Sequence, residues 1–278
     1  LEGFLAMRNF SDPSYLKKAQ YSNAENLDAR IRLHKQFSTN PQGVYHWFFD
    51  HALTHIPTQA SILEVGSGSG ELWATCKNRV PAGWDVTLSD FAMGILNDAK
   101  KKLDGVAFEP EYREIDVQSI PYPDESFDAV FANFMLYHVP DRQRAIAEIR
   151  RVLKPNGVIL AATLGKEHMR EYHHLIQVIL LDDNLQKDII GHAFGLENGM
   201  EQLSQSFNQI DMYLYEDNLR VTEVEPMVDY FLSLALPIIT SEHVERFTQT
   251  VRDIIAKDGA FIIHKHTGLF IGQGYAKK

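Results

Sequence analysis

The segment whose residues could most readily do chemistry is a loop with a glycine at every second position. Gly66, Gly68 and Gly70 follow a short apolar run and precede a helical pattern that begins at Glu71. Because glycine has no Cβ, such a loop turns tightly and lets a ligand approach the backbone, while the start of the next helix offers free N–H groups. The loop is therefore a candidate ligand cradle, and a tight turn without a ligand is the alternative.

The glycine spacing and one acidic neighbour narrow the kind of ligand. Dinucleotide-binding loops carry the pattern G-x-G-x-x-G, whereas this loop has G-x-G-x-G, with Glu64 two positions before its first glycine. A carboxylate at that place would repel a pyrophosphate, but it suits the ammonium group of an amino acid. The pattern therefore favours a ligand with a zwitterionic amino-acid end.

Two more acidic residues stand where later strands are expected to end. Asp90 comes about 20 residues beyond the loop, the position from which an acid binds ribose hydroxyls in nucleotide-binding sheets. Phe91 follows it and could pack on an adenine face, and Asp116 ends the third expected strand, where it can accept from an adenine amino group. Each could alone be a helix cap or a turn residue, but together they predict a bound nucleoside.

A framework of alternating strands and helices is expected to position these residues. Short apolar runs predict strands at 61–65, 86–90, 112–116, 127–133 and 158–162. Helical patterns lie between them, and Asp141 is expected to cap the helix before the last strand. This alternation predicts parallel pairing with right-handed crossovers and helices on both faces of the sheet. Ligands of such sheets bind beyond the carboxyl ends of the strands, which is where the glycine loop, Asp90 and Asp116 are expected.

The chain divides by pattern into four parts. Residues 1–55 predict helices, at about 26–37 and from 44 to before Pro57, that form a lid within the same domain. Residues 56–165 are the expected ligand-binding core. Residues 166–206 predict two or three helices as an insertion or cap, and residues 207–278 complete the sheet.

The last part mixes strands and helices. Its patterns predict strands at 209–215 and 219–224, helices at about 225–236 and 241–257, and a closing hairpin of 261–263 and 269–271 around Thr267 and Gly268.

Composition restricts the partners. The formal charge is −10, from 37 acidic and 27 basic side chains, and an acidic surface repels phosphate backbones, so nucleic acid is not expected as a partner. The single cysteine, Cys76, excludes an intrachain disulfide and fits a reducing compartment. No signal-peptide pattern and no apolar run of membrane-spanning length is present. We therefore expect a cytoplasmic protein, monomeric or homodimeric, that contacts neither membrane nor nucleic acid.

Four segments carry a family resemblance. Ile62–Gly70 resembles motif I of the class I S-adenosyl-L-methionine (SAM)-dependent methyltransferases, and Leu88–Leu96 resembles their motif after the second strand. Ile120–Val130 is similar to the segment before the fourth strand in the small-molecule branch (methyltransferase type 11/25-like), and Arg151–Gly157 looks like the turn before the fifth. The resemblance covers about residues 60–165. It implies a doubly wound, mostly parallel seven-stranded α/β sheet of Rossmann-like type, with SAM as donor and S-adenosyl-L-homocysteine as product.

The resemblance also implies roles for particular residues. Those expected around the donor are Tyr21, Arg30, Glu64, Gly66, Ser67, Gly68, Gly70, Asp90, Phe91, Asp116, Val117, Asn133 and Phe134. The glycine loop would line the methionine portion, Asp90 the ribose, and Asp116 with Val117 the adenine edge, while Asn133 and Phe134 would flank the sulfonium. The N-terminal helices, which also carry His34, would cover the donor, with Arg30 as a partner for the methionine carboxylate.

The acceptor side is less specified. Tyr137 and His138 follow the fourth strand and are the candidate catalytic residues that touch the acceptor, with a base needed only if the acceptor loses a proton; His138 could instead be a polar residue at a helix start. Four histidines of the insertion lack acidic or cysteine partners at metal-ligand spacing, so no metal is expected, but they could line the acceptor pocket. They are His168, His173, His174 and His192.

Asn133–Leu136 stands where the base-methylating branch has a Pro-Pro-aromatic tetrapeptide. We therefore expect a small organic acceptor, methylated on O, N or C. The alternatives are a nicotinamide-dependent oxidoreductase and a SAM-binding protein that transfers nothing.

Overall fold

A seven-stranded sheet forms the centre of the molecule. The computed structural model describes residues 25–181, 193–234 and 238–275, which is the part of the chain discussed below. The strands lie in the order β3-β2-β1-β4-β5-β9-β6. Their bounds are β1 Gln59–Val65, β2 Gly83–Asp90, β3 Glu111–Glu114, β4 Phe127–Phe131, β5 Leu153–Leu164, β6 Gln209–Tyr215 and β9 Thr267–Gln273. The order of β1 to β5 is that of a doubly wound sheet, with the switch point between β1 and β4.

Pairing divides the sheet into a parallel and an antiparallel part. β1 to β5 pair in parallel, whereas β9 runs antiparallel to both of its neighbours, β5 and β6. Apart from the exposed edge strand β3, the parallel strands are mostly buried because helices cover both of their faces. The predicted mostly parallel α/β fold is therefore confirmed.

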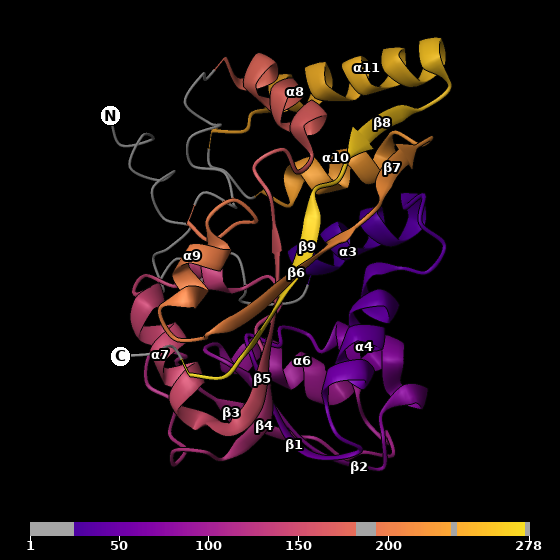
Figure 1. Cartoon of the computed structure of the whole chain (residues 1–278). Coiled ribbons are helices and arrows are strands. Elements are labelled where there is room, and N and C mark those ends of the chain that lie inside the picture. Colours follow the sequence, from indigo (N-terminus) through magenta and orange to yellow (C-terminus); the bar gives the residue numbers. More distant parts are fainter. Residues whose placement is uncertain (1–24, 182–192, 235–237, 276–278) are drawn as a thin grey trace.

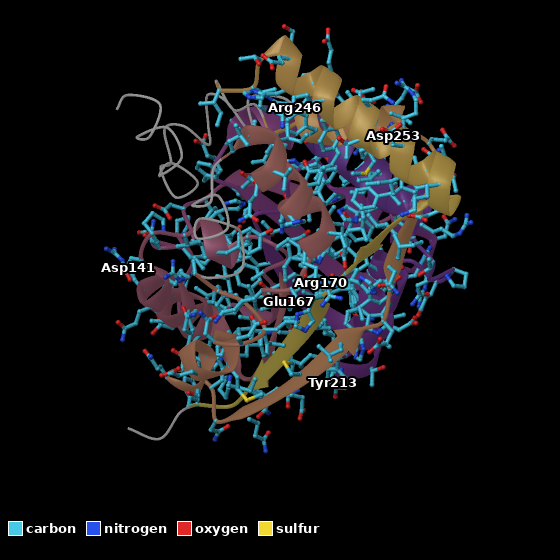
Figure 2. The ribbon with its side chains drawn as sticks, turned by 90° about the horizontal axis from the view of Figure 1, so that it is seen from above. Asp141, Glu167, Arg170, Tyr213, Arg246 and Asp253 are labelled. Atoms are coloured by element: carbon cyan, nitrogen blue, oxygen red, sulfur yellow. The ribbon has the colours of Figure 1, made fainter. Side chains whose placement is uncertain are left out.

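Helices cover the two faces of this sheet with separate apolar cores. On one face lie α7 (Arg142–Val152) and α9 (Gly199–Ser204), and on the other lie α4 (Val44–His55) and α5 (Glu71–Cys76). α6 (Met93–Lys102) connects β2 to β3, and short 3-10 turns, η3 (Lys77–Arg79) and η4 (Leu136–His138), follow α5 and β4. The predicted cap of α7 is confirmed, since the Asp141 side chain accepts a hydrogen bond from Arg144 N at 3.0 Å. Figure 2 shows Asp141 at the edge of the molecule.

A second module with its own core stands beyond one end of the sheet. It consists of α3 (Glu25–Phe37), α8 (Arg170–Leu180), β7 (Asn218–Val221), α10 (Glu225–Leu232), α11 (Ser241–Asp258) and β8 (Phe261–His264). Figure 1 shows α8 and α11 together at its top, and Figure 2 shows Arg246 and Asp253 along α11. Arg246 donates to the carbonyl of Ile179 at 3.3 Å and so joins α11 to α8.

One long antiparallel ribbon connects the module to the sheet. β6 pairs with β9, and β7 pairs with β8 in a separate two-stranded sheet. Tyr215 faces Thr267 and Asn218 faces His264, so the same register runs through both pairs, and Figure 1 shows the two strand pairs in line. At the interruption the Lys265 ammonium binds the Asp217 carboxylate at 2.5 Å, with both side chains almost fully buried.

This ribbon corrects two predictions. The predicted hairpin of 261–263 and 269–271 is wrong, because β8 pairs with β7 while β9 pairs with β5 and β6. The strand predicted at 219–224 ends at Val221, because α10 begins at Glu225 with Pro226 in its first turn, where proline is tolerated. The third strand also ends earlier than predicted, at Glu114.

Candidate functional site

A cavity of about 680 Å³ opens at the carboxyl ends of the parallel strands. Its walls come from the loops after β1 to β4, and α3 and α4 close it on the other side through Ile31 and Tyr45. The other lining residues are Glu64, Gly66, Ser67, Gly68, Ser69, Glu71, Leu72, Asp90, Phe91, Ile95, Glu114, Ile115, Asp116, Val117, Gln118, Asn133, Phe134, Met135, His138, Val139 and Pro140. The cavity lies at the switch point, where open α/β sheets bind ligands.

The glycine loop forms the floor of the cavity. Gly66 has φ 68°, and a Cβ on it would lie 2.8 Å from Cβ of Met135, so only glycine fits there. Gly70 also has a left-handed backbone, but its close neighbours are Ala99 and Leu103 of the α6 region, and it does not line the cavity. Gly70 therefore supports the loop from outside. The helix that follows, α5, has only six residues, so the expected contribution of a helix start is small.

Glu64 is a buried carboxyl group at the end of β1. It is 3% exposed, and its two oxygens accept from Trp73 Nε1 at 2.5 Å and from Asn133 Nδ2 at 3.0 Å. Burial raises the pKa of Glu64 to about 7, Asp90 adds to the rise, and the two hydrogen bonds oppose it. A cation placed beside Glu64 would stabilise its ionised form, in agreement with the ammonium preference expected for this position.

Two buried oxygen atoms in the cavity wall have no hydrogen-bond partner within the described part of the chain. They are Oδ1 of Asn133 and Oγ of Ser67. An unsatisfied buried polar atom costs about 1–3 kcal/mol, so a ligand that brings N–H donors would remove that cost. The α-ammonium group of SAM carries three such donors, so on this observation the residues present fit the expected donor.

Asp90 joins the end of β2 to the glycine loop. Its carboxylate accepts from Gly68 N and from Ala92 N, each at 3.1 Å, and the residue is 7% exposed. Asp90 and its neighbour Phe91 both line the cavity. The sequence prediction that these two residues lie together at the ligand site is in agreement with this geometry.

Asp116 lies beyond β3, two residues after the strand ends. Its side chain is exposed and accepts from the backbone and side-chain nitrogens of Gln118 at 2.9 and 3.0 Å, as a turn residue does. Asp116, the buried Val117 and Gln118 all line the cavity. Asp116 therefore shapes a turn and also lines the cavity, while its contact with an adenine stays a prediction.

The segment after β4 carries a strained residue. Phe134 has φ 55°, a left-handed value that costs a non-glycine residue about 1–3 kcal/mol, and its backbone N–H donates to Ala162 O at 2.9 Å. Asn133, Phe134, Met135 and His138 line the cavity. Tyr137 does not, because its ring packs against the core beside α7, 4.6 Å from the His138 ring. The expectation that Tyr137 touches the acceptor is therefore not supported by this geometry.

The N-terminal residues are only partly where they were expected. Tyr21 lies outside the described residues. Arg30 is not at the cavity: its Nε and Nη2 donate to the hydroxyl and carbonyl of Ser233, at 3.1 and 2.8 Å. Arg30 points away from the cavity because it lies beside Ile31 on α3, and neighbouring helix residues face about 100° apart. Ile31 and Tyr45, which the sequence did not single out, form this wall instead.

The histidines belong to the second module rather than to the cavity. The His34 ring lies 6.0 Å from that of His168 and 5.9 Å from that of Tyr230, and His168 Nδ1 accepts from His266 N at 3.1 Å. Burial lowers the pKa of His34 to about 3 and that of His168 well below its usual value. Neither these nor His173 and His174 line the cavity, and His192 lies outside the described residues.

The described residues form neither a cluster of metal ligands nor a helix that could span a membrane. No three or more histidine, cysteine, aspartate or glutamate side chains converge as metal ligands in residues 25–181, 193–234 and 238–275. None of the helices in these ranges has the length and apolar character that crossing a membrane requires.

Comparison with known proteins agrees with this geometry. A family model described as "Methyltransferase domain" matches residues 63–161. A demethylmenaquinone methyltransferase of Thermus thermophilus is 36% identical over 108 residues, which cover 39% of this chain and 48% of the relative. A ubiquinone/menaquinone biosynthesis C-methyltransferase (UbiE) of Methylococcus capsulatus is 30% identical over 118 residues, covering 42% and 48%. The matches thus span about half the length of these curated relatives.

A similar fold occurs in solved structures. A phosphoethanolamine N-methyltransferase of Haemonchus contortus, crystallised with SAM, superposes with a TM-score of 0.58 at 17% identity, covering 95% of this chain and 60% of that one. At this identity the likeness shows the fold alone.

Proposed function

Because residues 63–161 match a methyltransferase domain model, we propose that this protein is a class I SAM-dependent methyltransferase and transfers a methyl group from SAM to a small-molecule acceptor. The observation that carries the proposal is one cavity with a polar group for each end of the donor. Glu64 with Asn133 serves the ammonium, Asp90 the ribose, and Asp116 the adenine.

Each wall of the cavity has its part in holding the donor. Gly66–Gly68 would hold the methionine end, with Ser67 and Asn133, whose unpartnered oxygens are buried there, as partners for its ammonium. Phe91 and Val117 would contact the adenine, and Asp116 its edge. Binding SAM here would remove the cost of two unsatisfied buried oxygens.

The protein contributes mainly position and exclusion of water. The bound donor supplies a methyl carbon already activated by a sulfonium, so the carbon–sulfur bond breaks as the bond to the acceptor forms. Met135 and Phe134 hold the acceptor side of the cavity close to the methionine end. An acceptor that must lose a proton gives it to a ring nitrogen of His138, the only histidine among the described lining residues.

The wall chemistry favours an uncharged, mainly apolar acceptor. Ile31, Tyr45, Met135, Val139 and Pro140 all line the cavity. No lysine or arginine from the described ranges lines the cavity, so an anionic acceptor would find no counter-charge there. The curated relatives are named for quinone biosynthesis, and a quinone precursor is one example of a mainly apolar acceptor. The segment shared with these relatives covers the donor half of the site.

The first test is calorimetry followed by turnover. SAM is expected to bind and NAD is not; failure of intact protein to bind SAM would refute the proposal. A panel of apolar phenols, hydroquinones and amines is then screened against phosphorylated and carboxylated compounds for release of S-adenosyl-L-homocysteine. Binding without release for any compound would favour the SAM-binding protein that transfers nothing.

His138→Asn tests the proton acceptor. We expect kcat to fall by about 10²–10⁴, the usual contribution of a general base, with SAM affinity little changed. Tyr137→Phe is the matched control, because the Tyr137 side chain lies outside the cavity. Equal turnover of His138→Asn and the parent protein would leave His138 a structural residue.

A further inference from the structure

On the basis of the proposed function, we infer that the buried Glu64 carboxylate positions the methyl donor through Asn133. It holds the Asn133 amide with its nitrogen toward Glu64 and its oxygen toward the cavity, where that oxygen receives the donor's ammonium. Glu64 is thus a positioning residue, and donor binding is coupled to its protonation.

The hydrogen bonds of Glu64 fix its orientation. Trp73 Nε1 can only donate, and it occupies one carboxylate oxygen at 2.5 Å. Trp73 is 0% exposed and packs against Phe131 of β4, so it holds Glu64 from the core side. The other carboxylate oxygen is left for Asn133, whose Nδ2 lies 3.0 Å away.

The orientation of the Asn133 amide follows from that contact. An ionised carboxylate accepts and cannot donate, so the amide must present its NH₂ group to Glu64. Its Oδ1 then faces away from Glu64; that atom is buried and has no partner among residues 25–181, 193–234 and 238–275, and Asn133 is one of the residues that line the cavity. If Glu64 takes up a proton, it can donate, and the amide is no longer held in one orientation.

The surroundings of Glu64 make this proton exchange accessible near neutral pH. The titratable groups that interact with it are Asp90 of β2 and Tyr45 of α4, both acids. Glu71 of α5, which also interacts with Tyr45, is paired with Lys102 at 2.8 Å. Burial raises the pKa of Glu64 to about 7, so the free protein at pH 7 carries about half a proton there. A bound ammonium favours the carboxylate, lowers this pKa, and drives the proton off.

The sign of the pH dependence is therefore defined. Below pH 7 the donor must displace a proton from Glu64, so its affinity falls as the pH falls, approaching tenfold per pH unit. Above about pH 8 Glu64 is already ionised and releases no proton, while the α-amino group of the donor begins to lose its own proton, so affinity falls again.

Calorimetry in two buffers of different ionisation enthalpy tests the inference. The parent protein is expected to release about half a proton per SAM at pH 7 and none at pH 9. Glu64→Gln should abolish the release and weaken SAM binding at least tenfold, while His138→Asn, which changes another titratable group of the cavity, should keep the release. Asn133→Ala should weaken SAM binding similarly. Because Glu64 acts through Asn133, the double variant should bind SAM no more weakly than Asn133→Ala alone.

5′-Methylthioadenosine is the matched ligand control, because it keeps the adenosine and sulfur of the donor and lacks the amino-acid end. Its affinity is expected to be the same in the parent protein, Glu64→Gln and Asn133→Ala, which also verifies an intact cavity. Parent-like SAM binding by Glu64→Gln, release that persists in that variant, or equal weakening of both ligands would each overturn the inference while leaving the proposed function intact. If the parent protein binds neither ligand, the proposed function fails and the inference fails with it.

Discussion

Gly66 and Gly43 both have a positive φ but different surroundings. Their φ angles are 68° and 76°. A Cβ on Gly66 would lie 2.8 Å from Cβ of Met135, whereas a Cβ on Gly43 would meet no atom within 4 Å. The two glycines therefore separate the cost of an unfavourable backbone conformation from the cost of crowding the cavity.

Substituting each glycine by alanine gives the first prediction at this scale. Both variants should lose about 1–3 kcal/mol of unfolding free energy, the cost of a positive-φ backbone with a Cβ. Only Gly66→Ala must also displace Met135, so it alone should bind SAM at least tenfold more weakly. Urea unfolding and calorimetry measure the two effects, and equal SAM affinity in both variants would show that the close approach at Gly66 is irrelevant to the donor.

Most residues that carry chemistry could be located from the sequence, whereas the apolar walls could not. Glu64, Asp90 and Asn133 lie on the cavity because parallel strands bring their carboxyl ends to one edge, so a position along the chain becomes a position in space. The rotation of a helix about its own axis is not fixed by the sheet in this way. Arg30 and Ile31 are neighbours in the sequence, and only packing decides that Ile31 faces the cavity.

Among the elements, the ribbon of β6–β7 and β8–β9 shows the limit of local patterns. Phe261–Ile263 and Leu269–Ile271 are adjacent apolar runs, and a short link between such runs resembles a hairpin. Burial distinguishes them: β8 alternates buried and exposed residues, while β9 is buried throughout because it lies between β5 and β6. A chain that continues straight from one sheet into another leaves no local signal.

The second module gives a prediction at the element scale. Burial, with a contribution from Lys265, lowers the pKa of His34 to about 3, against about 6.5 in an unfolded chain. Between these values the unfolded chain binds a proton that the folded protein does not. Stability is therefore lost as the pH falls from about 6.5 toward 3, by up to about 1.4 kcal/mol per pH unit for this group.

His34→Gln should flatten that loss. Unfolding free energies measured between pH 7 and 4.5 are expected to fall less steeply for this variant than for the parent protein, by about one bound proton. His174→Gln is the matched control, because it removes an exposed histidine from α8. The same slope in His34→Gln and the parent protein would show that His34 is protonated in the folded state.

At the scale of the whole molecule, α3 contributes both to the core of the second module and to the cavity wall. Leu33 and Phe37 are part of the second module's core, while Ile31 lines the cavity. Two arginines join α3 to α10: Arg30 binds the buried Ser233, and Arg32 forms an exposed pair with Asp229 at 2.7 Å. The position of the cavity wall therefore depends on contacts made in the second module.

Removing each arginine contact tests this dependence. Arg30→Ala should lose about 1–3 kcal/mol of stability because it leaves buried groups unpartnered, and it should raise the KM for the acceptor or for SAM. Arg32→Ala, which removes an exposed pair, should change stability by less than about 1 kcal/mol and leave both KM values unchanged. Steady-state kinetics and thermal unfolding provide the readouts. Unchanged KM values in Arg30→Ala would show that the wall does not depend on this contact.

The overall sheet was predictable because alternating strands and helices usually form one arrangement, a parallel sheet covered by helices. The second module was not predictable. Its elements come from both sides of the segment that forms β1 to β5, with α3 before it and α8, α10 and α11 after it. Residues 166–206 were expected to cap the sheet edge; α9 does pack on the sheet, whereas α8 packs into a separate core.

The place of β9 in the sheet also sets an order of assembly during translation. β9 lies between β5 and β6, yet it is made after both. All parallel strands, β1 to β5, and the glycine loop are synthesised before β6 and β9. The donor-binding half can therefore fold early. β6 must wait for more than fifty residues of nascent chain before its partner strand exists. Until then the edge of β5 has no partner strand, and its unpaired backbone N–H and C=O groups are open to pairing with other chains.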